Sequence, residues 1–159
     1  MNVIQSEAKN LKKGFSHPSF RQRQRKMKGE QIPYKMLSQD AFSTWMGIEI
    51  IECEIGHCKV GMTIRKEMLN GMGKAHGAIS YALADTAFAF ASNSHGKHAV
   101  SIETSINHIE ALHEGDYLVA ESVIEKINNK LGFNVIEVKR GDELVALFKG
   151  VVYRTQKEW

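Results

Sequence analysis

The sequence predicts an α+β protein in which one antiparallel sheet curls around a single long helix. Residues 77–92 are apolar on every side apart from one acid, Asp85, and a helix of that kind must be covered on most of its surface. Four strand-like runs follow this segment, and the short turns between them favour antiparallel pairing. Two further strand-like runs precede it. A single sheet that wraps the helix would bury the helix and pair all of these strands.

The helices and strands can be placed along the chain in order. The first helix is expected at residues 34–47, where apolar side chains recur at helical spacing and Gly47 is a suitable stop. The long helix is expected at residues 77–92, with Gly96 in the region of its C-terminal cap. Strands are expected at residues 48–55, 59–64, 99–106, 116–127, 131–140 and 143–154. This order of elements matches the hotdog arrangement, an α+β fold in which the sheet wraps a central helix.

Length and composition indicate one soluble domain. The chain has 159 residues, and none of its apolar runs reaches the ~20 residues that span a bilayer. Its N-terminus lacks the continuous apolar segment of a secretory signal. The spacing of Cys53 and Cys58 fits no metal or redox motif, so two free thiols in a reducing cytoplasm are expected.

The positive charge of the chain is confined to its N-terminal arm. Residues 1–35 carry nine Lys or Arg against two acids, a net charge of +7, whereas residues 36–159 carry 12 against 16, a net charge of −4. We expect residues 1–33 to be a basic, disordered extension and residues 34–159 to form the folded domain. A nucleic-acid or membrane contact and a mitochondrial presequence are alternatives for the arm. The folded body gives no electrostatic reason to expect a nucleic-acid partner.

One stretch of the chain resembles a known family of enzymes. The segment "MLNGMGKAHGAISYALADTAFAFASNSHG" is similar to the PaaI-type acyl-CoA thioesterases of the hotdog superfamily. Their signature places an Asn six residues before a His-Gly-Gly turn and an acid nine residues after the His. Asn70, His76, Gly77, Asp85 and Thr86 match that spacing.

The resemblance covers about residues 36–155 and has one departure. Ala78 stands where the family has its second glycine, and alanine is the smallest replacement for it. The resemblance implies a cytoplasmic hydrolase that acts on an acyl-CoA thioester and forms homodimers, often paired into tetramers. It implies no membrane contact and no cofactor, since coenzyme A is part of the substrate. It points to aromatic acyl groups of the phenylacetyl type, as in phenylacetate degradation, although aliphatic acyl chains remain open.

Thioester hydrolysis requires a base or nucleophile and a group that stabilises the oxyanion. Asp85 is the candidate for the first role, as general base or as nucleophile. The N–H of Gly77 is the candidate for the second, because a helix N-terminus has unpaired N–H groups and a partial positive charge. We expect His76 to position this turn and contact the substrate. The alternative for Asp85 is a structural acid, and for His76 a cap or packing residue.

Four further residues are weaker candidates. Thr86 is expected to hold the attacking water and Asn70 to orient the thioester or the water. Their alternatives are a hydrogen bond to a helix carbonyl and a role in the Asn-Gly turn. Ser101 and Asn107, on the strand after the helix, are candidates for lining the substrate channel.

The spacing within the long helix predicts a site shared between subunits. Gly77 and Asp85 are eight residues apart, which is ~12 Å along a helix. Two groups that act on one carbonyl must each lie within ~4 Å of it. We therefore expect Gly77 and Asn70 from one subunit to meet Asp85 and Thr86 from another.

Other functions remain as alternatives. A hotdog dehydratase acting on acyl thioesters differs in how it pairs a His with an acid. A non-enzymatic regulator that senses acyl-CoA would need a DNA-binding element, and the arm shows no helix-turn-helix pattern. The spacing in "HGKH" at residues 95–98 is typical of metal ligands, but no further ligands accompany it, so no metal site is expected.

Overall fold

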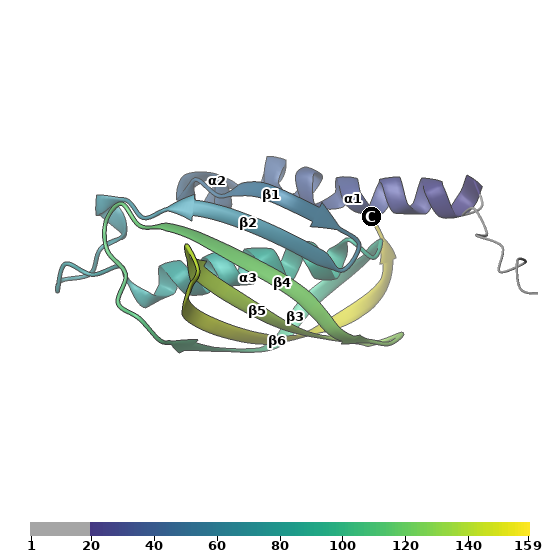
Figure 1. Ribbon diagram of the computed structural model, residues 1–159. Coiled ribbons are helices and arrows are strands. Elements are labelled where there is room, and N and C mark those ends of the chain that lie inside the picture. The colour runs from purple at the N-terminus through teal and green to yellow at the C-terminus, as the bar shows by residue number, and fades with distance from the viewer. Residues whose placement is uncertain (1–19) are drawn as a thin grey trace, which may run out of the picture.

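The computed structural model of the protein describes residues 20–159 and shows six antiparallel strands curved around one central helix (Figure 1). The strand order across the sheet is β1-β2-β4-β5-β6-β3, so β1 and β3 form its two edges. The strands are β1 (Glu49–Glu54), β2 (His57–Thr63), β3 (Lys97–His108), β4 (Tyr117–Ile127), β5 (Leu131–Arg140) and β6 (Glu143–Glu158). The helices are α1 (Phe20–Gln39), α2 (Ala41–Met46) and α3 (Gly77–Asn93), with a short 3-10 turn η2 (Lys66–Met68). The predicted fold class is confirmed.

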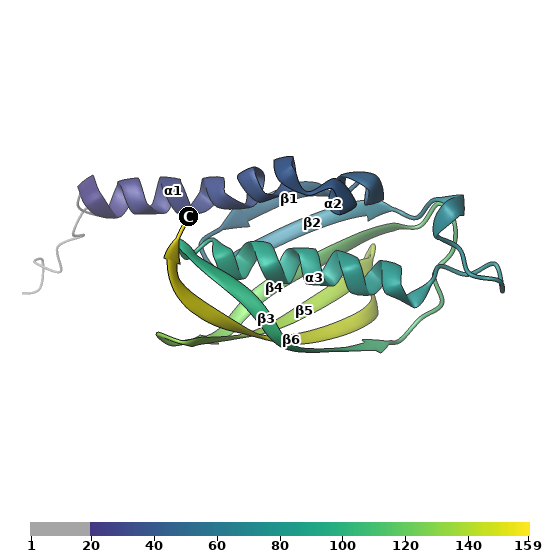
Figure 2. The same ribbon diagram turned by 180° about the vertical axis from the view of Figure 1, so that it is seen from behind.

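The core lies between α3 and the inner face of the sheet. Leu83, Ala87 and Phe88 of α3 are almost fully buried there. Alternate residues of the strands face them, as expected for a sheet with one side turned to the core. These inner-face residues include Val60, Met62, Leu118, Ala120, Ile136, Val138, Ala146 and Phe148. The sheet lies in front of α3 in Figure 1 and behind it in Figure 2, so one side of the helix is left without a covering strand.

The N-terminal boundary predicted from the sequence needs correction. Helix α1 begins at Phe20, so residues 20–33 are helical rather than part of a disordered extension, while residues 1–19 lie outside the described part of the chain. The helix is held by packing that charge counting could not foresee. Ile32 is only 3% exposed, and Gly29 lies so close to the end of α3 that an added Cβ would be 2.5 Å from the Ser94 carbonyl oxygen. Pro33 lies inside the helix and does not end it.

The segment predicted as one helix at residues 34–47 is divided between α1 and α2. Asp40 separates them because its carboxylate accepts the N–H of Ser43 at 2.9 Å and so caps α2. Gly47 ends α2 with φ of +75°, in agreement with its expected role as a stop. None of the helices among residues 20–159 combines the length and the apolar character needed to cross a membrane.

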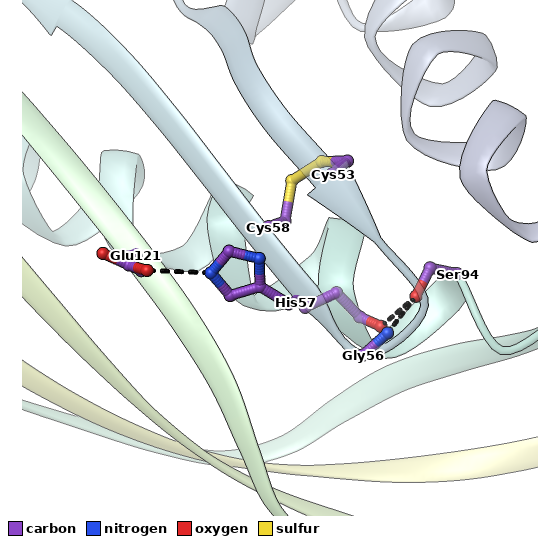
Figure 3. Close-up of a disulfide and its surroundings, with 7 residues drawn as sticks. Cys53, Gly56, His57, Cys58, Ser94 and Glu121 are labelled. Carbon is purple, nitrogen blue, oxygen red and sulfur yellow. Dashed lines mark hydrogen bonds and ion pairs between the residues drawn. A yellow bond between two sulfur atoms is a disulfide. The ribbon is translucent and has the colours of Figure 1, made fainter.

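The two cysteines form a disulfide, so the prediction of two free thiols was wrong. Cys53 on β1 and Cys58 on β2 are cross-strand partners of one hairpin, with their Cα atoms 4.2 Å apart. Their spacing alone could not show this, because the pairing depends on the register that the turn sets. Figure 3 also shows the Gly56 N–H in that turn donating to Ser94 Oγ at 2.8 Å, which ties the hairpin to the end of α3.

Candidate functional site

A pocket of about 410 Å³ is lined by residues of α1, α2 and α3. Figure 2 shows the side of α3 that no strand covers. Asp85 and Thr86 line the pocket from the middle of α3. The other lining residues are Met36, Asp40, Phe42, Ser43, Ala78, Tyr81, Ala82, Ala89 and Phe90. The pocket is therefore mainly apolar, and the side-chain oxygens of Asp40, Ser43, Tyr81 and Thr86 join that of Asp85 in its lining.

Asp85 is half-buried, and its carboxylate has no ion pair or hydrogen bond with any residue from 20 to 159. Burial removes water from the carboxylate, which raises the pKa of Asp85 above the usual value of an aspartate. An acid in such surroundings, with no partner to stabilise its charge, is typical of a reactive group rather than of a structural ion pair. Asp85 is therefore the strongest candidate for the base or nucleophile.

Thr86 makes the ordinary helix bond and also faces the pocket. Its hydroxyl donates to the carbonyl of Ala82 at 2.9 Å, the structural alternative considered for this residue. Its oxygen also lies 3.4 Å from Ser43 Oγ on α2. Ser43 in turn donates to the carboxylate of Asp40 at 2.7 Å. Ser43 and Asp40 were not predicted as part of the site, although an Asp just before a helix is a recognisable N-cap signal.

A second group of candidates lies at the N-terminus of α3. His76 is the N-cap, and its Nδ1 accepts the N–H of Ala78 at 3.1 Å. Gly77 is the first residue of the helix, and its N–H has no acceptor among the described residues. This free N–H at the positive end of a 17-residue helix is the arrangement that an oxyanion donor requires.

The ring of His108 lies beside this turn and was not predicted. A Cβ added to Gly77 would lie 3.0 Å from His108 Nε2, and His108 Nδ1 lies 3.3 Å from Ser80 Oγ. His108 belongs to the edge strand β3, so only the strand register brings it here. A side chain at position 77 would therefore require the His108 ring to move by a few tenths of an ångström.

Asn70 lies in the loop before α3 and organises that loop. Its side-chain oxygen accepts the N–H groups of Met72 at 2.8 Å and Lys74 at 3.3 Å. Its backbone N–H donates to the Lys74 carbonyl at 2.7 Å. These contacts are those of the turn residue considered as an alternative.

The two candidates on β3 lie on opposite faces of the sheet. Ser101 pairs with Val152, whose side chain is buried in the core, so Ser101 faces the α3 side. Asn107 pairs with Leu147 and lies on the outer face, one residue before His108. Within one chain, therefore, the structure brings Asp85 and Thr86 together and His76 and Gly77 together. The unbroken helix α3 holds these two groups ~12 Å apart.

The two histidines of the "HGKH" segment, whose spacing is typical of metal ligands, contact different parts of the structure. His98 stacks on Trp159 with ring centroids 4.3 Å apart. His95 is partly buried beside Gly56, and this burial lowers the pKa of its imidazole. Residues 20–159 contain no group of three or more His, Cys, Asp or Glu side chains placed to hold a metal ion.

Comparison with known proteins gives consistent matches over the site. The sequence profile of the thioesterase superfamily matches residues 72–147, which include His76, Gly77, Asp85 and Thr86. A protein of Archaeoglobus fulgidus named as an esterase is 41% identical over 131 residues, 82% of this chain and 85% of that protein. The acyl-coenzyme A thioesterase PaaI of Escherichia coli is 37% identical over 128 residues, 80% of this chain and 91% of that protein.

A solved structure agrees with the sequence matches. The E. coli PaaI protein from the phenylacetic acid degradation operon has a TM-score of 0.81 and 34% identity to this chain. The match covers 84% of this chain and 97% of that one. The likeness therefore extends over almost the whole of that protein.

Proposed function

Because the chain belongs to the thioesterase superfamily and is a hotdog-fold thioester hydrolase, we propose that it cleaves an acyl-coenzyme A thioester to the free acid and coenzyme A. The observation that carries this proposal is Asp85, a carboxylate without a partner among the described residues in an otherwise mainly apolar pocket. The name of the E. coli relative supports acyl-CoA as the substrate. Coenzyme A is part of the substrate, and the reaction needs only water besides.

In the proposed reaction the two groups on α3 act on one thioester carbonyl. The N–H of Gly77 and the positive end of the helix stabilise the negative charge that develops on the carbonyl oxygen. Asp85 serves as general base or as nucleophile. His76 holds the turn through its bond to Ala78, and Asn70 shapes the loop that precedes it.

This reaction requires two copies of the chain, since the two groups on α3 lie ~12 Å apart within one. Two surfaces support a homodimer. The open side of α3 carries small, partly exposed residues, Ala78, Ala82 and Ala89, in line with Asp85. The edge strand β3 exposes Val100 by 53% and Ile102 by 58%, an apolar edge that a second copy would cover. A dimer of dimers would keep the same shared sites.

The lining of the pocket supports an aromatic acyl group such as phenylacetyl. Met36, Phe42, Tyr81 and Phe90 supply apolar and aromatic surface around Asp85. The match to a protein of the phenylacetic acid degradation operon agrees with this choice. Ser101 faces the same side of the sheet as α3, which supports its proposed contact with the substrate, whereas Asn107 would make such a contact only from the outer face of β3.

A panel of acyl-CoA thioesters, followed by the release of free thiol, tests the proposal. Wild-type protein should hydrolyse at least one of them, with phenylacetyl-CoA among the best. Asp85→Asn should lose activity by a factor of ~10² or more, the usual contribution of a positioned base. Asp142→Asn, which makes the same change at an exposed turn, should keep wild-type activity. Hydrolysis of none of the thioesters, or an unaffected Asp85→Asn variant, would rule the proposal out.

A further inference from the structure

Two buried hydroxyl oxygens, one on α2 and one on α3, lie close together in the Asp85 pocket. Ser43 Oγ on α2 and Thr86 Oγ1 on α3 are 3.4 Å apart. Ser43 is 1% exposed and Thr86 is 8% exposed. Both residues line the pocket beside Asp85.

The hydrogen atom of each hydroxyl is used elsewhere. Ser43 donates to Asp40 Oδ2 at 2.7 Å, and an ionised carboxylate can only accept. Thr86 donates to the Ala82 carbonyl at 2.9 Å, which also can only accept. Both of these bonds are shorter than the 3.4 Å between the two hydroxyls, so neither hydrogen atom is free for that contact. With both hydrogen atoms used in this way, the pair presents lone pairs and can accept a hydrogen bond from an external donor.

We propose that Ser43 and Thr86 together accept a hydrogen bond from the water molecule that attacks the thioester, and that Asp40 keeps Ser43 in this accepting orientation. This inference rests on the proposed function and makes it more specific, because it assigns Asp85 the role of general base. Water is a small hydrogen-bond donor that the proposed reaction itself consumes, and both hydroxyls line the pocket that it would enter. Asp40 does not touch the water and is a positioning residue.

The step balances as follows. One hydrogen of the water is bonded to the Ser43–Thr86 pair, and the other is transferred as a proton to Asp85. The water oxygen forms a bond to the thioester carbonyl carbon while the carbonyl π bond opens, and its electron pair gives the oxyanion. The carbonyl then re-forms as the carbon–sulfur bond breaks, and the proton on Asp85 passes to the departing thiolate. The products are the free acid and coenzyme A, with no other reactant needed.

Asp40→Asn reverses the orientation of the Ser43 hydroxyl without removing the helix cap. The Asn side-chain oxygen still accepts the Ser43 N–H, because Asn and Asp are equally good N-caps. Its NH₂ group then faces Ser43 Oγ and must donate to it. The Ser43 hydrogen is consequently turned toward Thr86, and the pair loses its accepting character.

Steady-state kinetics on the full chain give the first test. Ser43→Ala and Asp40→Asn should each lower kcat about tenfold, the value of one hydrogen bond to the reacting water, with little change in KM. Adding Asp40→Asn to Ser43→Ala should have no further effect, since Asp40 acts only through Ser43. Thr44→Ala removes a neighbouring exposed hydroxyl of α2 and should match the wild type.

Two kinetic results would overturn the inference while leaving the proposed function intact. One is a wild-type kcat for Ser43→Ala in a protein whose Asp85→Asn variant is inactive. The other is an Asp40→Asn substitution that lowers kcat by the same factor whether Ser or Ala occupies position 43. A wild-type protein that hydrolyses no acyl-CoA would instead contradict the proposed function.

A crystal structure at high resolution tests the Ser43–Thr86 acceptor pair without any measurement of activity. An ordered water within hydrogen-bond distance of both Ser43 Oγ and Thr86 Oγ1 is expected in the wild type. The same water should be lost or displaced in Ser43→Ala. A wild-type pocket with no water at this position, or with the two hydroxyls bonded to each other, would refute the acceptor pair.

Discussion

The ring of Phe88 on α3 lies against Gly150 on β6, so that a Cβ added to the glycine would be 2.7 Å from the ring carbon Cζ. Phe88 is 1% exposed and also contacts Phe148, with ring centroids 5.6 Å apart. This contact sets the distance between the sheet and the middle of α3, the part of the helix that carries Asp85. Glycine at position 150 is thus a requirement of close packing.

Gly150→Ala should destabilise the protein by about 1–3 kcal/mol, because the buried Phe88 ring has little room to move away from the added methyl group. Urea unfolding at pH 7 measures the change. Gly71→Ala is the control, since a Cβ at that position would meet no atom within 4 Å. Equal stability of the Gly150→Ala variant and the wild type would show that Phe88 can shift freely.

Asp85→Asn should make the protein more stable at pH 7. Burial raises the pKa of Asp85 in the folded state above the value of about 3.9 expected for the unfolded chain. The folded state therefore binds the proton more tightly, and wild-type stability falls as the pH rises from the unfolded pKa through the folded pKa. The gain from the substitution should vanish below pH ~3.9. Thermal unfolding between pH 3 and pH 8 measures this, and a gain that does not depend on pH would contradict it.

The loss of activity at low pH should reflect the raised pKa of Asp85. Asp85 must be ionised to accept a proton, so kcat/KM should fall on acidification at a pH above the range in which an exposed aspartate is protonated. Assays of kcat/KM against pH measure the midpoint. Samples returned to pH 7 must recover full activity, which excludes unfolding as the cause. A midpoint at or below pH ~4 would show that Asp85 is not the titrating base.

Mixed subunits should restore a shared site. Gly77→Pro removes the N–H at the first position of α3, where proline is tolerated, and Asp85→Ala removes the carboxylate. Each variant alone should be inactive. Equal mixtures, refolded together, should regain about a quarter of wild-type activity, because half of the dimers are hybrids with one intact site of two. Hybrid dimers that are folded and inactive would count against a site shared between the two subunits.

The sequence predicted the main elements of the fold because their signals are local. The expected helix at residues 77–92 is α3, one residue longer, and the strand at residues 131–140 is β5 with the same bounds. Residues 20–33 were assigned wrongly, since their charge suggested disorder while Gly29 and Ile32 pack on elements far along the chain. The disulfide was missed for a related reason, because it depends on hairpin register.

The candidate site also has one part that the sequence predicted and one part that depends on the tertiary structure. The sequence by itself determined that Asp85 sits in an apolar helix and lies too far from Gly77 to act with it in one chain, because the rise of a helix is fixed. Only the tertiary structure placed Ser43 beside Thr86 and His108 beside Gly77, because these pairs join α2 or β3 to α3. Helical spacing is carried by neighbouring residues, whereas contacts between distant segments depend on how the sheet closes around the helix.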